Sequence, residues 1–143
     1  MNIWGAIWCN GRTSFFPALF NSNHYIHVLQ GHLRPHLPLL RKEFIHDGVP
    51  WHWTHAVQNW CDYNRVSVVQ DFPAQSPDLN AIEYVWAYVK HKVRAGHPTN
   101  YQSLKNAIRS AWERLSQNMI RHYINHMGTV MRSIVASEGW DSM

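Results

Sequence analysis

Residues 76–86 have the sequence SPDLNAIEYVW, which joins a proline-broken polar loop to a helix. Asn80 and Glu83 have the spacing of a capping box, in which the N-cap side chain and the side chain three residues later each accept a backbone hydrogen bond. On this local pattern alone, helix capping is the favoured interpretation of Glu83. The apolar residues that follow have helical spacing and predict a helix over 80–94: Ile82, Val85, Trp86, Val89 and Val93.

A second carboxylate stands upstream of this helix, at the end of a short predicted strand. Residues 43–46 (EFIH) form that strand and Asp47 follows it directly. Ligand sites in α/β sheets form at such strand ends. Carboxylates at a strand end and on a neighbouring helix can converge on Mg²⁺, which favours one or two carboxylates plus water and phosphate oxygens. A simple turn at Asp47-Gly48 is the ordinary alternative.

The remaining pattern predicts an α/β sheet with helices packed on it. Asn10-Gly11 is a strong hairpin signal between two apolar runs. The buried positions are expected to include Trp86, Trp112 and the aromatic residues of 3–8. The predicted strands span 3–9, 13–20, 43–46 and 66–69. The predicted helices span 22–40 (kinked or ended by Pro35 and Pro38), 53–63, 80–94, 101–115 and 117–136.

Composition narrows the class of protein. The 143 residues suit one domain, and 45% hydrophobic residues are enough for a packed core. A formal charge of +4 favours nucleic acid or another polyanion as partner. Neither a signal peptide nor a membrane span of about 18 apolar residues is expected. Cys9 and Cys61 alone make no disulfide framework. Three histidine pairs have zinc-compatible spacing, although structural roles are the favoured interpretation: His24/His27, His32/His36 and His52/His55.

Several segments together resemble one known family. Residues 76–86 closely resemble the S-P-D-L-N-P-I-E-x-x-W signature of Tc/mariner-type transposases, members of the DDE superfamily. Residues 46–52 (HDGVPWH) look like that family's D-N-A-P-x-H segment. Residues 3–5 resemble its V-W-G strand, and residues 25–29 resemble its Y-I-x-x-L. Residues 127–139 look like its C-terminal M-P-R-R segment and the helix after it, so the resemblance covers nearly the whole chain.

The resemblance implies an RNase H-like α/β fold: a mixed sheet flanked by helices, with a helical C-terminal part. Residues 1–143 would form a single partial DDE transposase catalytic domain. Asp47 and Glu83 would be the second and third members of a catalytic carboxylate triad that binds Mg²⁺ or Mn²⁺. In the family two such ions support in-line attack on phosphodiesters, which gives cleavage and strand transfer in DNA transposition.

The resemblance also suggests where DNA is bound. His52 and Asn80 would orient ligands or contact phosphate. Lys90, Lys92 and Arg94 would contact DNA, although a solvated helix face is the ordinary interpretation of those three. The expected partners are transposon-end and target DNA, a second copy of the chain or an intact transposase, and the expected location is the nucleus.

Departures from the family pattern limit the expected activity. The family's first Asp lies on a strand upstream of V-W-G, and no equivalent precedes residue 3. We therefore expect the N-terminal strands to be missing, an apolar strand edge to be exposed, and the chain by itself to be inactive. Ala81 stands in place of a proline, and residues 128–130 (GTV) stand in place of P-R-R. The alternative function is a non-catalytic nucleic-acid-binding or protein-interaction module derived from a transposase.

Overall fold

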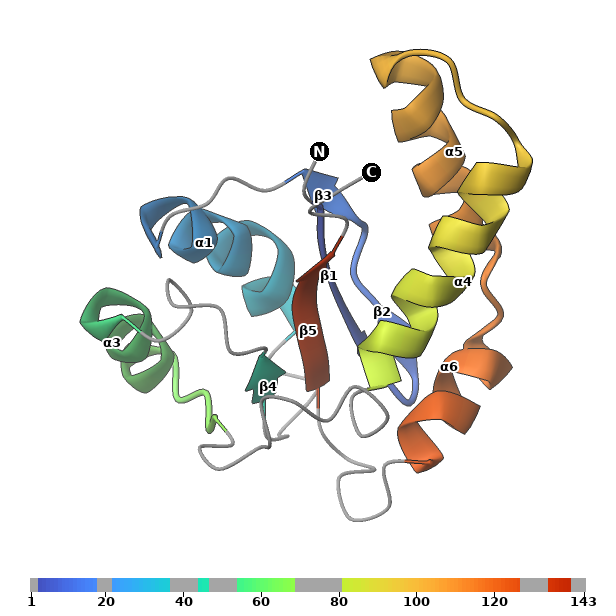
Figure 1. The fold of residues 1–143 in the computed structure, drawn as a ribbon. Helices are drawn as coiled ribbons and strands as arrows, with labels where there is room; N and C mark the ends of the chain where they lie inside the picture. Colours follow the sequence, from blue (N-terminus) through green and yellow to red (C-terminus); the bar gives the residue numbers. More distant parts are fainter. Residues whose placement is uncertain are drawn as a thin grey trace.

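A central sheet separates two groups of helices in the computed structural model (Figure 1). The structure describes residues 3–17, 22–36, 44–46, 54–68, 81–126 and 134–139. Figure 1 shows α1 and α3 on one side of the sheet and α4, α5 and α6 on the other. The side chains of the first strand alternate between these two sides, so that each side has its own buried cluster.

The N-terminal hairpin forms, but its two-residue turn is Cys9-Asn10 and not Asn10-Gly11, because Gly11 already belongs to the second strand. Strand β1 (Ile3–Trp8) pairs antiparallel with β2 (Gly11–Arg12), with Trp8 opposite Gly11. The predicted strand over 13–20 is shorter: β3 (Phe16–Pro17) pairs with the start of β1, as an edge position for Pro17 allows. Between β2 and β3, Thr13 is buried, and its Oγ1 accepts a hydrogen bond from the Ala6 amide at 3.0 Å.

The interior of the sheet differs from the prediction. Strand β5 (Ile134–Gly139) lies between β1, to which it is antiparallel, and β4 (Phe44–His46), to which it is parallel. The strand order is β2-β1-β5-β4. The prediction of one helix over 117–136, and with it of an entirely helical C-terminal part, is therefore wrong. The prediction of an exposed apolar edge is also wrong for β1, because β5 pairs with it from Ile3 to Ile7.

On the α1 side of the sheet the first helix is interrupted and the second, α3, is short and regular. Helix α1 (Ser22–Val28) continues as a π-helical turn (Leu29–Leu33) and a 3₁₀ turn (Arg34–His36). The helix predicted over 22–40 is therefore present as three helical segments from Ser22 to His36. Residues 37–40 of that prediction lie outside the described residues. Helix α3 (His55–Tyr63) is capped by Thr54. The predicted strand at 66–69 is reduced, among the described residues, to a single bridge between Val68 and Phe44.

The other side carries the helices predicted from periodicity. These are α4 (Ala81–Ala95), α5 (Tyr101–Arg114) and α6 (Gln117–Asn125). Asn100 caps α5, accepting a hydrogen bond from the Ser103 amide at 2.8 Å. No helix within these described ranges is long and apolar enough to cross a membrane.

Trp112 joins α5, α4 and the sheet. Its ring stacks on Trp86 of α4 at a centroid distance of 5.2 Å, and its Nε1 donates to the Thr13 carbonyl at 2.8 Å. A Cβ added to Gly5 of β1 would lie 2.6 Å from the Trp112 ring, so only glycine fits beneath it. The prediction that Trp86, Trp112 and the tryptophans of 3–8 belong to the core is confirmed, since all are at most 6% exposed.

Candidate active site and nucleic-acid surface

Glu83 lies in the first turn of α4, where the predicted helix should place it. It is partly buried. The residue before it, Ile82, is fully buried in the same cluster as Ile45 of β4. Both α4 and β4 contact the intervening strand β5. The start of α4 and the strand β4 are thus parts of one packed unit.

The other predicted site residues follow or precede described elements. Asp47 is the residue after β4, and Asn80 is the residue before α4. Asp47, His52 and Asn80 themselves lie outside the described residues. The structure therefore fixes the backbone elements that flank the two predicted carboxylates, and it describes one of the two directly.

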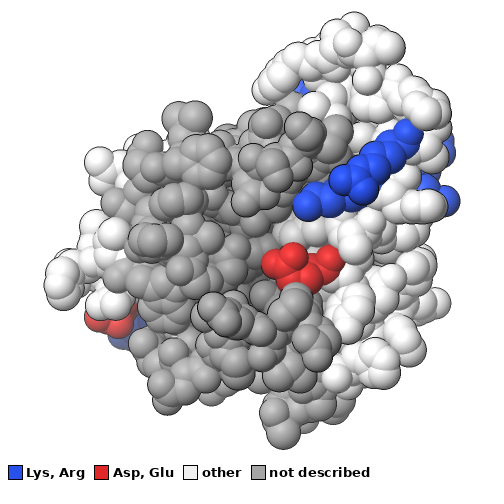
Figure 2. All heavy atoms as spheres, viewed as in Figure 1, with Lys and Arg blue, Asp and Glu red and all other residues white. Residues whose placement is uncertain are grey.

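The three basic residues predicted to contact DNA do not share one flank of α4. Lys90 and Arg94 follow Glu83 by seven and eleven residues, close to two and three turns of helix, so these two lie along one flank with Glu83. Figure 2 shows basic side chains as a stripe over α4, with acidic atoms near the lower end of that stripe. We call the side of α4 that carries Glu83, Lys90 and Arg94 the Glu83 flank.

Lys92 belongs to the opposite flank of α4, which faces α5 and α6. Its Nζ lies 5.6 Å from the centroid of the Tyr88 ring. Tyr84, one turn earlier, stacks on Tyr123 of α6 with a centroid distance of 5.4 Å. This flank is thus an aromatic contact between helices, and Lys92 extends along its rim. The sequence analysis grouped Lys92 with Lys90 and Arg94 as residues that would contact DNA. In the helix, Lys92 lies on the opposite flank from those two.

The described acidic side chains are spread over three helices: Asp62 on α3, Glu83 on α4 and Glu113 on α5. Within the described part of the chain no group of three His, Cys, Asp or Glu side chains could hold a metal ion. Glu138 is on β5, where its backbone pairs with Trp4. Sequence reasoning did not bring Arg12 together with Arg109, and these two line a hollow between the hairpin and α5. No motif signals that pair, because the fold brings together positions far apart in the sequence.

Comparison with known proteins identifies the class. The sequence profile of the family described as DDE superfamily endonuclease matches residues 1–105. Because that match spans more than half of the 143 residues, the chain belongs to this family. Its mixed sheet with helices on both sides is compatible with such a domain.

Its relatives refine the class to Tc/mariner-type transposase domains, as the resemblance of residues 76–86 predicted. The Tc1 transposase of Caenorhabditis elegans is 25% identical over 146 residues, which cover 96% of this chain and 52% of that protein. The Tc3 transposase of the same nematode is 28% identical over 144 residues, which cover 96% of this chain and 44% of that protein. The Tcb2 transposase of Caenorhabditis briggsae is 24% identical over 146 residues, with coverage of 96% and 52%. The chain thus spans about half the length of the curated relatives it matches.

Proposed function

We propose that this chain is the core of an RNase H-like DNA transposase domain, in which Asp47 and Glu83 bind a divalent metal ion and DNA runs along the Glu83 flank. The observation that carries the proposal is the packing of α4 and β4 against the same strand, β5. Asp47 directly follows one of these elements, and Glu83 lies in the first turn of the other.

The two carboxylates suit Mg²⁺ or Mn²⁺ chemically. Both ions prefer oxygen ligands, and Mg²⁺ is commonly bound through one or two carboxylates with water and substrate phosphates completing its shell. The partly buried position of Glu83 raises the strength of its interaction with a cation relative to a fully solvated carboxylate. When bound, the ion would polarise a phosphodiester and lower the pKa of attacking water.

Metal binding provides the first prediction. We expect Asp47→Asn and Glu83→Gln each to weaken Mn²⁺ binding to residues 1–143 by roughly tenfold or more, because loss of a direct ligand costs at least as much as loss of its supporting partner. Isothermal titration calorimetry measures this change. Glu113→Gln is the matched control, since it removes a carboxylate from α5 and leaves the predicted site unchanged.

The proposed site in residues 1–143 has two members of a catalytic carboxylate triad, Asp47 and Glu83. We therefore expect residues 1–143 by themselves to bind metal weakly and not to nick supercoiled DNA. Metal-dependent nicking that Glu83→Gln abolishes would overturn the expectation of inactivity. Mn²⁺ affinity that is equal in wild type, Asp47→Asn and Glu83→Gln would overturn the metal site itself. Salt-sensitive DNA binding without any metal binding would then favour the non-catalytic module.

DNA binding along the Glu83 flank provides the second prediction. We expect the double substitution Lys90→Gln/Arg94→Gln to weaken binding to a short duplex and to lower the slope of log affinity against log salt by about two, one for each lost phosphate contact. Lys92→Gln, on the same helix but the opposite flank, should have a smaller effect. Fluorescence anisotropy at several salt concentrations measures both. Equal losses from the two flanks would contradict the proposed DNA path.

A further inference from the structure

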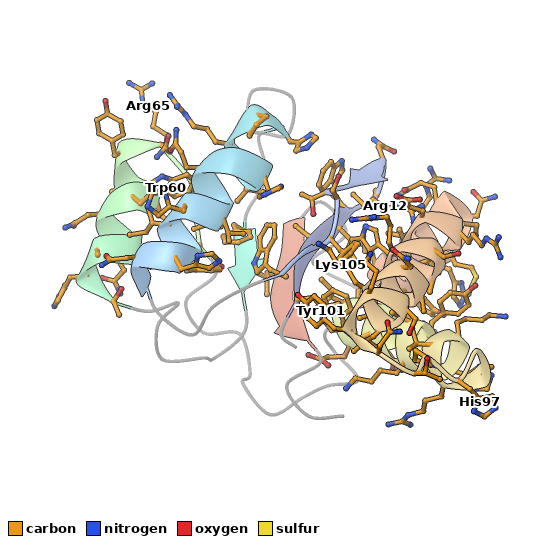
Figure 3. All side chains as sticks on the ribbon, turned by 90° about the horizontal axis from the view of Figure 1, so that it is seen from above. Arg12, Trp60, Arg65, His97, Tyr101 and Lys105 are labelled. Carbon is orange, nitrogen blue, oxygen red and sulfur yellow. The ribbon has the colours of Figure 1, made fainter. Side chains whose placement is uncertain are left out.

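A hollow of about 480 Å³ lies between the β1–β2 hairpin and α5. Two arginines from distant parts of the chain line it, Arg12 of β2 and Arg109 of α5, together with Ser14 and Glu113. Figure 3 shows Arg12 beside α5, on the opposite side of the helical layer from His97. In Figure 3, which is seen from above, the front of the molecule in Figures 1 and 2 is at the bottom, and Arg12 lies toward the top. The hollow beside Arg12 therefore faces away from the side on which Figure 2 shows the basic stripe.

Arg12 is held in place by the core. Its Nη1 donates to the Trp112 carbonyl at 2.6 Å, while the Trp112 indole donates to the Thr13 carbonyl at 2.8 Å. These bonds tie the loop after β2 to α5, so the guanidinium does not have to be ordered when a ligand arrives. Burial lowers the pKa of Arg12, which reflects a positive charge in a partly desolvated position.

Arg109 is oriented by a different contact. Its guanidinium carbon lies 5.5 Å from the centroid of the Phe15 ring, a cation–π arrangement. Among the described residues neither Arg12 nor Arg109 forms an ion pair with a carboxylate. Glu113 lines the same hollow and is exposed, as Arg109 is, so solvent weakens the effect of its negative charge without removing it. Two guanidinium groups that form no ion pair within the described part of the chain favour an anionic ligand.

The walls of the hollow indicate which anion it suits. Phe15 and Trp112 are 8% and 2% exposed, so neither ring offers a face on which a base could stack. The guanidinium groups and the hydroxyl of Ser14 are donors suited to phosphate oxygens. A second hollow of about 380 Å³ continues along α5, lined by Arg109 and Arg114 and again by Glu113. A chain of phosphates fits such a continuing row of arginines better than a single small ion does.

We propose that the hollow between Arg12 and Arg109 is a phosphate-binding site, and that it holds a backbone phosphate of a nucleic acid on the side of α5 away from Glu83. The assignment of the phosphate to a nucleic acid rests on the proposed function, whereas the phosphate site itself does not. The chain would then contact nucleic acid on two surfaces, the Glu83 flank of α4 and this side of α5.

Two titrations test the proposal on the folded 143-residue chain. In the first, inorganic phosphate is added at constant ionic strength while the NMR signal of the Trp112 indole N–H is followed. In the second, affinity for a labelled 20-base-pair duplex is measured over a range of salt. We expect Arg109→Gln to remove the phosphate-induced shift, to reduce duplex affinity about tenfold, and to lower the salt slope by about one.

Charge-changing variants separate this effect from a loss of folding. Glu113→Gln removes the negative charge beside the arginines and should strengthen both interactions, which an unfolded variant could not do. Arg121→Gln, an exposed arginine of α6, is the matched control and should leave both unchanged.

Absence of a phosphate-induced shift, or an equal shift in wild type and Arg109→Gln, would overturn the site. A shift that Arg109→Gln removes, with duplex affinity unchanged, would overturn the nucleic-acid source and leave a site for free phosphate. Failure of the proposed function is distinguishable, because it removes the dependence of duplex binding on Lys90 and Arg94.

Discussion

Removal of β5 is expected to abolish cooperative folding. A chain that ends at residue 133 lacks the strand that pairs with both β1 and β4. The side chains of β1 are buried from Ile3 to Trp8, so backbone groups released there stay away from water unless the sheet opens. Each unsatisfied buried group costs about 1–3 kcal/mol, and several together exceed the roughly 5–15 kcal/mol that stabilise a domain.

Circular dichroism during heating measures this effect. The matched control is a chain that ends at residue 139, which retains all of β5 and should melt like residues 1–143. The 133-residue chain should show no cooperative transition and no near-ultraviolet signal from its tryptophans. A cooperative melt of that chain within a few degrees of the control would show that β5 contributes little to the sheet.

Substitution of Gly5 is expected to give the largest loss of stability from a single methyl group. The added Cβ of Gly5→Ala would lie 2.6 Å from the Trp112 ring. Trp112 cannot easily move aside, because it stacks on Trp86 and its indole is bonded to Thr13. Overpacking of this kind costs about 1–3 kcal/mol, and Gly5→Val should cost more.

Urea denaturation measures the change in the free energy of unfolding. Gly31→Ala is the control glycine, since no described heavy atom beyond its chain neighbours and its own helical backbone lies within 4 Å of the added Cβ. Alanine there should be neutral or stabilising. Trp112→Phe combined with Gly5→Ala should be less destabilising than the sum of the two single substitutions, because the smaller ring relieves the clash. Full additivity would contradict the direct contact.

Several elements that local signals predict are present in the structure, whereas the strand that closes the sheet is not among them. Asn10-Gly11 predicts a hairpin, and one forms with its turn one residue earlier, at Cys9-Asn10. The apolar spacing of α4 and α5 marks one buried face each. Strand β5 is not predicted, because Ile134 and Val135 also continue the helical spacing of Met127 and Met131. Its pairing partners lie at the other end of the sequence, where no local pattern could reveal them.

The candidate site is predictable only in part for a similar reason. The sequence block at 76–86 is sufficient to locate Glu83 on the first turn of α4. Lys90, Lys92 and Arg94 look equivalent in sequence, and helix geometry assigns Lys92 to the side that faces α5. Arg12 and Arg109 line one hollow because Trp112 joins the hairpin loop to α5. Contacts of that kind depend on packing between remote segments.

Because β5 is synthesised last among the strands and lies inside the sheet, the sheet forms late during translation. In the pairing of β5 with β1, Ile3 lies opposite Gly139. The pair of strands therefore cannot form until residues 3–139 have been synthesised and have left the ribosome. At about 5–20 residues per second, the nascent hairpin waits on the order of 10 s for its inner neighbour. During that interval an apolar edge is open to other nascent chains, and high contact order slows closure further. We therefore expect the newly made protein to depend on chaperones that shield extended segments during translation.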